Sequence, residues 1–316
     1  MINYFFFFLA GLILLIISSD CLIQSSVKLS LFFRLTPLFI GLIVVALGTS
    51  APEAGVGIMA AIRNQKSIAL GNIVGSNIAN IGLILGVCAL CSPLKINKRV
   101  FKTELPIMIF AVTLLYILCL DLCLSRVDGA ILILCFIIFI LVSYKNARRS
   151  FNENEISDFK FRKVLRKIDS RPVIFCITLI SIAGIICGAD LMVKGGVGFA
   201  GKMGISPWII AITVFSVGTS LPELVASVTA SFKKVPSISV GNVIGSNIFN
   251  ILLVLGVVSL IRPIPVQVSY LGFEYLVLIC FSLALFLFME TKYKMGRLEG
   301  FVLLLGYILF IVFLVL

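Results

Sequence analysis

Residues 48–90 read GTSAPEAGVGIMAAIRNQKSIALGNIVGSNIANIGLILGVCAL, and residues 218–260 read GTSLPELVASVTASFKKVPSISVGNVIGSNIFNILLVLGVVSL. The two stretches align without a gap at a constant offset of 170, and 21 of the 43 aligned positions are identical. Two apolar helices would share leucine and valine by chance, but they would not share GTSxPE and GNxxGSNIxN at equal separation. The chain therefore contains an internal duplication, with signature regions at 36–90 and 206–260.

Around these signatures the chain is too apolar for a soluble protein. Hydrophobic residues make up 60% of its 316 positions and charged residues 13%, whereas soluble chains carry about 25% charged residues. Most of the apolar side chains must therefore face lipid, and one span needs roughly 20 of them. We expect an all-α membrane protein with ten transmembrane helices, near 3–19, 36–62, 68–92, 103–120, 127–144, 173–193, 205–231, 237–261, 271–289 and 299–316.

Five predicted helices precede a hydrophilic stretch at 145–171, and five follow it. Because five is odd, the second copy enters the membrane in the opposite orientation. The sequence thus predicts two inverted-topology five-helix repeats, at 1–144 and 172–316. Inverted repeats are typical of secondary transporters, whose substrate site lies between the repeats near the bilayer midplane. The alternative is a duplicated scaffold with no transport role.

The 145–171 stretch is basic, with nine lysines and arginines against four acids. By the positive-inside rule it is cytoplasmic, which places both termini outside. The first apolar segment has no basic residues before it, so we interpret it as a retained helix and not a cleaved signal. The net charge of +12 follows from this topology, so we expect no nucleic-acid partner.

The residue types present exclude several kinds of site. The chain has no histidine, which excludes serine–histidine triads, HExxH zinc sites and histidine pH switches. Its nine cysteines lie mostly in apolar runs, without the spacing of a disulfide framework. Cys88 and Cys91 form a CxxC, but with no second pair we interpret them as small buried hydrophobic residues.

Two acidic residues lie deep inside predicted spans, and they occupy equivalent positions in the two copies. These are Glu53 and Glu223; the other acids lie in loops or near helix ends. A charged group at a helix centre costs at least ~2.5–3.5 kcal/mol, so it is a functional candidate by default. Since no lysine or arginine lies at similar depth, the pair calls for a mobile cation. A protonated glutamate satisfied by local hydrogen bonds is the alternative.

Each glutamate follows a Thr-Ser pair bracketed by glycine and proline, as in Gly48 and Pro52. Because proline removes a backbone donor, we expect carbonyls near Ala46, Thr49, Ser216 and Thr219 to lose their helical partners. Non-helical backbone at membrane depth is tolerated only where it lines a cavity. Carbonyls, hydroxyls and carboxylates are hard oxygen ligands, which suit Ca²⁺ and Na⁺. The alternative is a kink that serves helix packing alone.

The GNxxGSNIxN motif predicts a polar stripe along a second helix of each copy. The stripe consists of Asn72, Ser76 and Asn80 in the first copy and of Asn242, Ser246 and Asn250 in the second. A GxxxG pair lies beside each stripe (Gly71 and Gly75, Gly241 and Gly245) and lets two backbones approach closely. We expect Asn80 and Asn250 to be ligands, whereas Asn77 and Asn247 could equally bond only to neighbouring backbone.

With GTSxPE and GSNIxN present twice and inverted, the sequence resembles the cation/calcium exchanger superfamily, and most closely its prokaryotic sodium/calcium exchangers with ten helices. The resemblance covers both signatures and the layout of the whole chain. It implies an antiporter of a prokaryotic inner membrane in which Ca²⁺ and Na⁺ compete for overlapping sites. We expect no cofactor and a functional monomer, and the first and sixth helices would slide across the core to switch access.

The resemblance also implies a ligand set. Calcium would bind Glu53 and Glu223 with the carbonyls of Thr49 and Thr219, and Asn80 and Asn250 would complete the central cluster. Sodium would use the same glutamates with Ala46, Ser50, Ser76, Ser216, Ser220 and Ser246. Several relatives carry an aspartate where this chain has Asn80 or Asn250, so its site has a formal charge of −2, which matches one Ca²⁺ or two Na⁺.

We therefore expect a secondary active, electrogenic calcium:sodium antiporter and not an enzyme. A calcium/proton antiporter on the same fold is the main alternative, although the proton-coupled branch usually has a GNxxE-type signature. A cation channel is a second alternative, which the inverted repeat and the buried acid pair disfavour. An intramembrane hydrolase is a third, but no nucleophile–base pair stands near the glutamates.

Overall fold

The computed structural model describes residues 2–62, 66–95, 100–152, 159, 161, 165, 168–202, 216–266, 273–290 and 293–315. Helices dominate the described chain, and the strands are two residues long. The elements before the basic stretch are α1 (Ile2–Phe33), α2 (Pro37–Ile40), η1 (Gly41–Val45), α3 (Ala46–Thr49), α4 (Ala51–Ile62), α5 (Lys66–Ala79), η2 (Asn80–Leu85), α6 (Gly86–Cys91), β1 (Leu94–Lys95), η3 (Val100–Glu104), α7 (Leu105–Leu118), β2 (Cys123–Leu124) and α8 (Arg126–Arg149).

The second half repeats this order. Its elements are α10 (Arg171–Lys202), α12 (Ser216–Thr219), α13 (Leu221–Phe232), α14 (Pro236–Ile248), η6 (Phe249–Leu255), α15 (Gly256–Ile261), β3 (Ile264–Pro265), α17 (Glu274–Glu290), β4 (Lys294–Met295) and α18 (Arg297–Val315). The elements labelled η are π-helical turns that continue the α-helices around them.

Seven described helices are long and apolar enough to cross a membrane, and the bent pair Pro37–Thr49 and Ala51–Ile62 makes an eighth. The described helices therefore account for seven or eight of the ten predicted spans. Within the predicted 205–231 span, residues 205–215 lie outside the described part, and α13 has 12 residues. At 17 residues, α17 also falls short of the roughly 20 that a span needs.

The predicted end of the first helix is wrong. The expected span at 3–19 ends at a polar stretch, but α1 continues to Phe33. Its polar segment remains helical because the side chains find partners: Ser19 Oγ donates to the Val225 carbonyl at 3.1 Å, and Lys28 Nζ donates to the Ile168 carbonyl. Lys28 therefore lies buried within a helix and not in a loop.

Local capping sets the start of α8. The Ser125 hydroxyl accepts from the Asp128 N–H at 3.3 Å, and the Asp128 carboxylate accepts from the Ser125 N–H at 2.7 Å. This reciprocal capping box satisfies two helix-end donors. The helix ends at Arg149, so the first basic residues of the 145–171 stretch continue α8 and are not loop.

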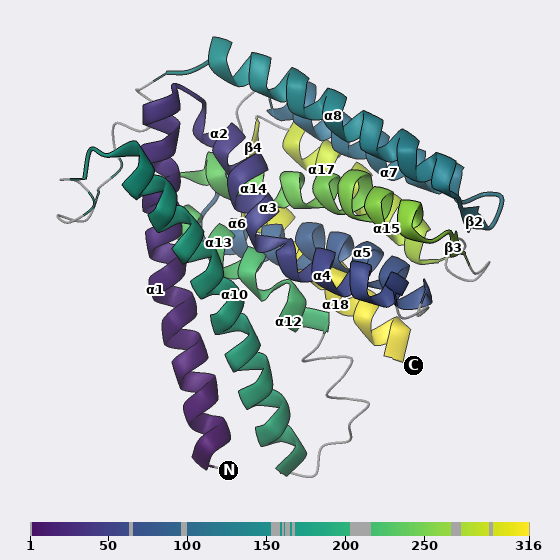
Figure 1. The fold of residues 1–316 in the computed structure, drawn as a ribbon, viewed down its shortest axis with the longest axis horizontal. Coiled ribbons are helices and arrows are strands. Elements are labelled where there is room, and N and C mark those ends of the chain that lie inside the picture. Colours follow the sequence, from purple (N-terminus) through teal and green to yellow (C-terminus); the bar gives the residue numbers. More distant parts are fainter. Residues whose placement is uncertain are drawn as a thin grey trace.

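Two long helices, α1 and α10, lie side by side and project away from the remaining helices (Figure 1). Glycines allow this close approach, since a Cβ at Gly11 would lie 2.5 Å from the Met192 nitrogen and one at Gly195 would lie 2.5 Å from the Phe8 nitrogen. α1 is the first helix of the first copy and α10 is the first helix of the second copy, so each is the counterpart of the other.

The short strands also pair between the copies. β1 pairs antiparallel with β4, with Leu94 opposite Met295, and β2 pairs antiparallel with β3, with Leu124 opposite Ile264. β1 and β3 lie 170 positions apart, and β2 and β4 lie 171 positions apart, so each pair is equivalent to within one residue. Exchanging the copies therefore turns one two-stranded sheet into the other, as a two-fold relation requires.

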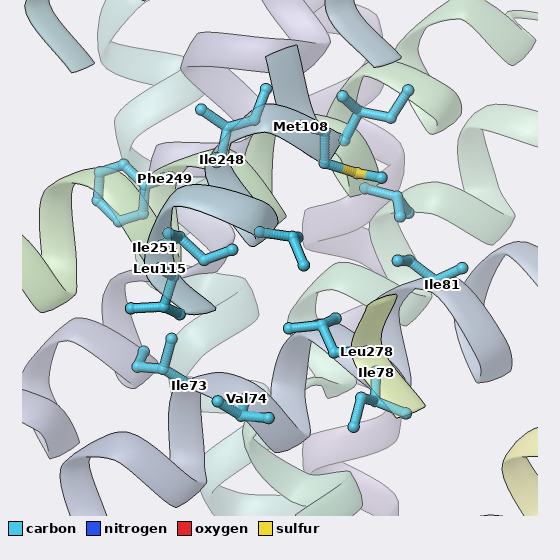
Figure 2. Packing of buried hydrophobic residues seen from close by; sticks show 14 of the residues in the cluster. Ile73, Val74, Ile78, Ile81, Met108, Leu115, Ile248, Phe249, Ile251 and Leu278 are labelled. Carbon is cyan, nitrogen blue, oxygen red and sulfur yellow. The ribbon is translucent and has the colours of Figure 1, made fainter. Parts of the chain in front are cut away.

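The main apolar core forms where α5 and η2 of the first copy meet α14 and η6 of the second, with α7 and α17 packed around them. Figure 2 shows this packing, in which Ile73, Val74, Ile78 and Ile81 lie with Ile248, Ile251, Met108, Leu115 and Leu278. The two GNxxGSNIxN helices are thus held together at the centre of the molecule.

The GxxxG prediction is confirmed in the second copy. A Cβ at Gly241 would lie 2.5 Å from the Leu38 oxygen, and one at Gly245 would lie 2.1 Å from the Leu42 oxygen. At Gly71 and Gly75 no described atom comes within 4 Å of such a Cβ. All nine cysteines are unpaired, and of the CxxC pair Cys88 is buried whereas Cys91 is exposed.

Candidate ion-binding site

Both signature helices break at the serine that lies two residues before the proline. Ser50 has φ −82° and ψ 7°, and Ser220 has φ −90° and ψ 4°, so both leave the helical region in the same way. In the first copy the segments on either side of the break differ in direction by 46°. Each break carries a glutamate into the first turn of the next helix, at Glu53 in α4 and Glu223 in α13.

The break frees some carbonyls and not others. Ala54 and Leu224 donate to the Ser50 and Ser220 carbonyls, but among the described residues no backbone donor reaches the Thr49 or Thr219 carbonyl across the break. The expectation for the two threonines is thus met.

For Ala46 the expectation is wrong, because its carbonyl accepts from the Ser50 N–H at 2.9 Å. Proline removes the donor four residues after Gly48, whereas the Ser50 donor is intact. Ser216 lies in α12, and its side chain is outside the described part of the chain.

The two glutamates are buried side chains that meet between the copies. Each is 1% exposed, and they lie close enough for their charges to repel. The Ser50 hydroxyl donates to Glu223 Oε1 at 2.8 Å, which connects the first copy to the second. The hydroxyls of Ser76 and Ser220 lie beside the Glu53 carboxyl. Within the described chain no lysine or arginine forms an ion pair with either glutamate.

Four asparagines form a hydrogen-bonded cluster between the same two copies. Asn80 Nδ2 donates to Asn247 Oδ1 at 3.3 Å, and Asn250 Nδ2 donates to Asn77 Oδ1 at 3.1 Å. These two bonds are equivalent under the repeat offset of 170. Asn77 Nδ2 also donates to the Asn247 carbonyl at 3.3 Å. Asn77 and Asn247 therefore bond across the copies and not only to neighbouring backbone.

This cluster occupies the amide nitrogens and leaves the central amide oxygens free. Asn80 and Asn250 also sit in π-helical turns, η2 and η6, which recur at functional sites. The buried oxygens that have no hydrogen-bond partner include six from predicted site residues: Glu53 Oε2, Glu223 Oε2, Asn80 Oδ1, Asn250 Oδ1, Ser220 Oγ and Ser246 Oγ. A buried unpaired polar atom costs about 1–3 kcal/mol, so this concentration of oxygens is suited to a hard cation.

Three features of the described residues were not expected from the sequence. Asn242 accepts from the Thr49 hydroxyl at 3.2 Å and donates to Ser227 Oγ at 2.9 Å. Glu104, near a helix end, is 1% exposed. Its equivalent Glu274 has an unpartnered buried Oε2. Glu104 and Glu274 are 170 positions apart. This repeat offset was the feature of the sequence that could have singled them out.

The chain matches the family model described as "Sodium/calcium exchanger protein" over residues 3–145 and 173–316. The chain belongs to the sodium/calcium exchanger family. The two matched ranges cover both copies and leave out most of the basic stretch between them. Membership makes the protein an integral, multi-pass membrane transporter and not an enzyme, so the intramembrane hydrolase is excluded.

Several known proteins resemble the chain over most of its length. Putative antiporter CaxA of Alkalimonas amylolytica is 33% identical over 306 residues, which cover 96% of this chain and 95% of that one. Sodium/calcium exchanger MaX1 of Methanosarcina acetivorans is 35% identical over 341 aligned positions, which cover 98% and 97%. Inner membrane protein YrbG of Escherichia coli is 34% identical and covers 87% and 85%.

The fold also matches a solved exchanger. A structure of the sodium-calcium exchanger NCX_Mj, soaked with zero Na⁺ and Ca²⁺, superposes with a TM-score of 0.86 at 32% identity, covering 99% of both chains. The structure soaked with 2.5 mM Na⁺ and 0.1 mM Ca²⁺ gives 0.84. Sequence and fold thus assign this chain to the same family.

Proposed function

We propose that the protein is a secondary active antiporter that exchanges Ca²⁺ against Na⁺ at a site built on Glu53 and Glu223. The observation that carries this proposal is the group of buried, unpartnered carboxylate, amide and hydroxyl oxygens between the copies, next to two carboxyls without a basic partner. Oxygen-only sites of this kind suit Ca²⁺ and Na⁺. The names of the exchanger MaX1 and of NCX_Mj support the same pair of ions.

The two ions share the glutamates and differ in the neutral ligands. Calcium is bound by both glutamates, by the Thr49 and Thr219 carbonyls and by the amide oxygens of Asn80 and Asn250. Sodium uses the glutamates with the four serines Ser50, Ser76, Ser220 and Ser246, and with Ala46 and Ser216 at the preceding helical turns. The Ala46 carbonyl accepts from the Ser50 N–H and, at 3.4 Å, from the Thr49 hydroxyl, so it would serve sodium when that hydroxyl donates to Asn242 Oδ1 instead.

Competition for the same carboxylates couples the two fluxes. When the site is empty it carries a formal charge of −2, which is costly to move through a low-dielectric barrier. The unloaded protein therefore changes its access slowly, whereas the calcium-loaded or sodium-loaded protein changes it readily. We propose that the exchange is electrogenic, which an imposed membrane potential would test.

The architecture proposed with this function is ten spans in two inverted repeats, at 1–144 and 172–316. The reciprocal strand pairing and the equivalent asparagine bonds support a two-fold relation between the copies. We place the basic 145–171 connection in the cytoplasm and both termini outside, in the inner membrane of a prokaryote. The protein is proposed to work as a monomer and without a cofactor.

Radioactive calcium uptake into proteoliposomes tests this function. Vesicles are loaded with sodium, with potassium or with an acidic buffer, and external calcium is supplied to each. Uptake from sodium-loaded vesicles alone supports Na⁺/Ca²⁺ exchange. Uptake driven only by the proton gradient would assign the same site to a calcium/proton antiporter, and uptake without any counter-ion would indicate a channel.

A further inference from the structure

The two equivalent halves of the site differ in their hydrogen bonding, and Asn242 is at the centre of the difference. Its Oδ1 accepts from the Thr49 hydroxyl at 3.2 Å, and its Nδ2 donates to Ser227 Oγ at 2.9 Å and to the Glu223 carbonyl at 3.4 Å. Asn242 is fully buried. This single amide therefore connects the break of the first copy to the glutamate turn of the second.

The repeat counterpart of Asn242 is Asn72, and it makes none of the equivalent bonds. Its Nδ2 is buried without a partner, and no side-chain hydrogen bond joins it to Thr219 in the described chain. The hydroxyl of Ser220 lies beside the Glu53 carboxyl, as that of the equivalent Ser50 lies beside Glu223, so the serines do not carry the difference. The asymmetry lies at the asparagines: the half with Asn242 is hydrogen-bonded across the copies, and the half with Asn72 is open in the described chain.

We infer that Asn242 is a positioning residue for the ion site, and that Asn72 takes over its role when the site faces the other side of the membrane. This inference rests on the proposed antiport. If inverted repeats exchange roles between the two access states, a hydrogen-bonded half in one state becomes the open half in the other. Asn242 then holds Thr49 and Glu223 together in the state described here, and Asn72 holds Thr219 and Glu53 together in the opposite state.

The exchange of roles is unequal, because one partner is missing from the first copy. Ser227 accepts from Asn242, but the residue equivalent to Ser227 is Gly57, which has no side chain to offer Asn72. A Cβ at Gly57 would meet methyl groups of Val254 and Val258 at 3.4 and 3.5 Å, which are ordinary contact distances. A serine therefore fits at position 57 and would supply the missing acceptor.

Four substitutions test this inference through the direction of their effects. Asn242→Ala and Ser227→Ala weaken the described state, and Gly57→Ser strengthens the opposite one, so all three shift the equilibrium the same way. Asn72→Ala removes bonds made only in the opposite state and shifts it the other way. A hydrogen bond worth about 1 kcal/mol changes such an equilibrium about fivefold, and the apparent affinity at each membrane face changes with the populated fraction.

The measurement is the half-saturating calcium concentration for sodium-dependent transport, compared between right-side-out and everted membrane vesicles. We expect the ratio of the two values to move in one direction for the first three variants and in the opposite direction for Asn72→Ala. A merely structural role would lower the amount of folded protein and leave this ratio unchanged. Ser231→Ala is the matched control, because Ser231 lies one turn beyond Ser227 in α13 and bonds Ser239 outside the site at 3.2 Å.

Amide hydrogen exchange on the purified protein provides a readout that does not require transport. Asn242→Ala should speed exchange in residues 221–228, and Asn72→Ala should not. Shifts of the calcium ratio in the same direction for Asn72→Ala and Asn242→Ala, or equal exchange in both variants, would overturn the inference. If the wild-type protein shows no sodium-dependent uptake, the proposed antiport fails. The amide hydrogen-exchange experiment still decides whether Asn242 positions the site.

Discussion

At the scale of single residues, the site depends on oxygen atoms that the fold buries and leaves unpaired. Glu53 and Glu223 are each 1% exposed, and their charges face one another with no basic side chain between them in the described chain. Folding alone would favour pairing or neutralising such groups. Their persistence in an equivalent pair is explained most simply by a cation that arrives and leaves.

We predict that Glu53→Gln and Glu223→Gln abolish exchange without preventing membrane insertion. Removing one charge of a buried ion contact costs about 2–5 kcal/mol, which corresponds to a loss of calcium affinity of at least roughly thirtyfold. The measurement is sodium-dependent calcium uptake normalised to the amount of inserted protein. Glu290→Gln, at the exposed end of α17, is the matched control and should transport normally. Robust uptake by the Glu53→Gln protein would contradict the assignment.

For Asn250 we predict a selective effect on sodium. Its Nδ2 is held by Asn77, so its free Oδ1 is the atom offered to an ion. Loss of one neutral ligand costs about 1 kcal/mol, so Asn250→Ala should raise the half-saturating sodium concentration about fivefold and change calcium binding less. Asn152→Ala, an exposed amide after α8, should change neither value. An unchanged sodium dependence in the Asn250 variant would remove Asn250 from the ligand set.

At the scale of elements, an ion pair attaches α1 to the helix that carries Glu223. Asp20 of α1 forms an ion pair with Lys233 at the end of α13, with side chains 13% and 23% exposed. Among the described residues the equivalent Asp190 of α10 pairs with Lys194 of its own helix, and both side chains there are more than half exposed. The Asp20–Lys233 pair thus ties α1 to α13 at a partly buried position.

We predict that Asp20→Asn lowers the apparent melting temperature of the purified protein. The Asp20–Lys233 pair is only partly solvent-exposed, so we expect a coupling of about 1 kcal/mol, or roughly 1.5 °C for a chain of 316 residues. The measurement is thermal unfolding of the wild type, Asp20→Asn, Lys233→Gln and the double variant, compared as a double-mutant cycle. Additive effects of the two substitutions would show that the ion pair contributes nothing.

At the scale of the whole molecule, the copies are related by contacts that connect each to the other. Both two-stranded sheets pair one copy with the other, and the asparagine cluster does the same at the centre. A substrate site between two such halves can be reached from either side by relative movement of the helices around it. The proposed alternating access is therefore a property of the paired copies and not of one helix.

The proposed topology predicts the location of each end of the chain. A periplasmic reporter such as alkaline phosphatase, fused after Leu316, should be active, because the carboxyl terminus is placed outside. The same reporter fused after Ser150 should be inactive, because the basic 145–171 connection is placed in the cytoplasm. Activity of both fusions, or of neither, would contradict the five-helix inverted arrangement, and activity of the second alone would reverse the assigned orientation.

Much of this protein could be predicted without its structure, because the deciding features are local or periodic. Apolar segments report on lipid exposure, and a gap-free offset of 170 reports on duplication. A carboxyl within an apolar span is costly wherever the span packs, so Glu53 and Glu223 could be selected from sequence alone. The family also follows from the same motifs, as its match to residues 3–145 and 173–316 confirms.

Only the tertiary structure decided which polar atoms are satisfied. The amides of Asn80 and Asn250 could have presented either nitrogen or oxygen to the site, and bonds to residues 167 and 173 positions away determine that the oxygens are free. The same holds for Asn242, whose partners come from both copies, and for the polar half of α1. The physical reason is that a side chain's own sequence neighbours do not determine which distant donor completes its hydrogen bonds. The packing of one copy against the other makes that choice.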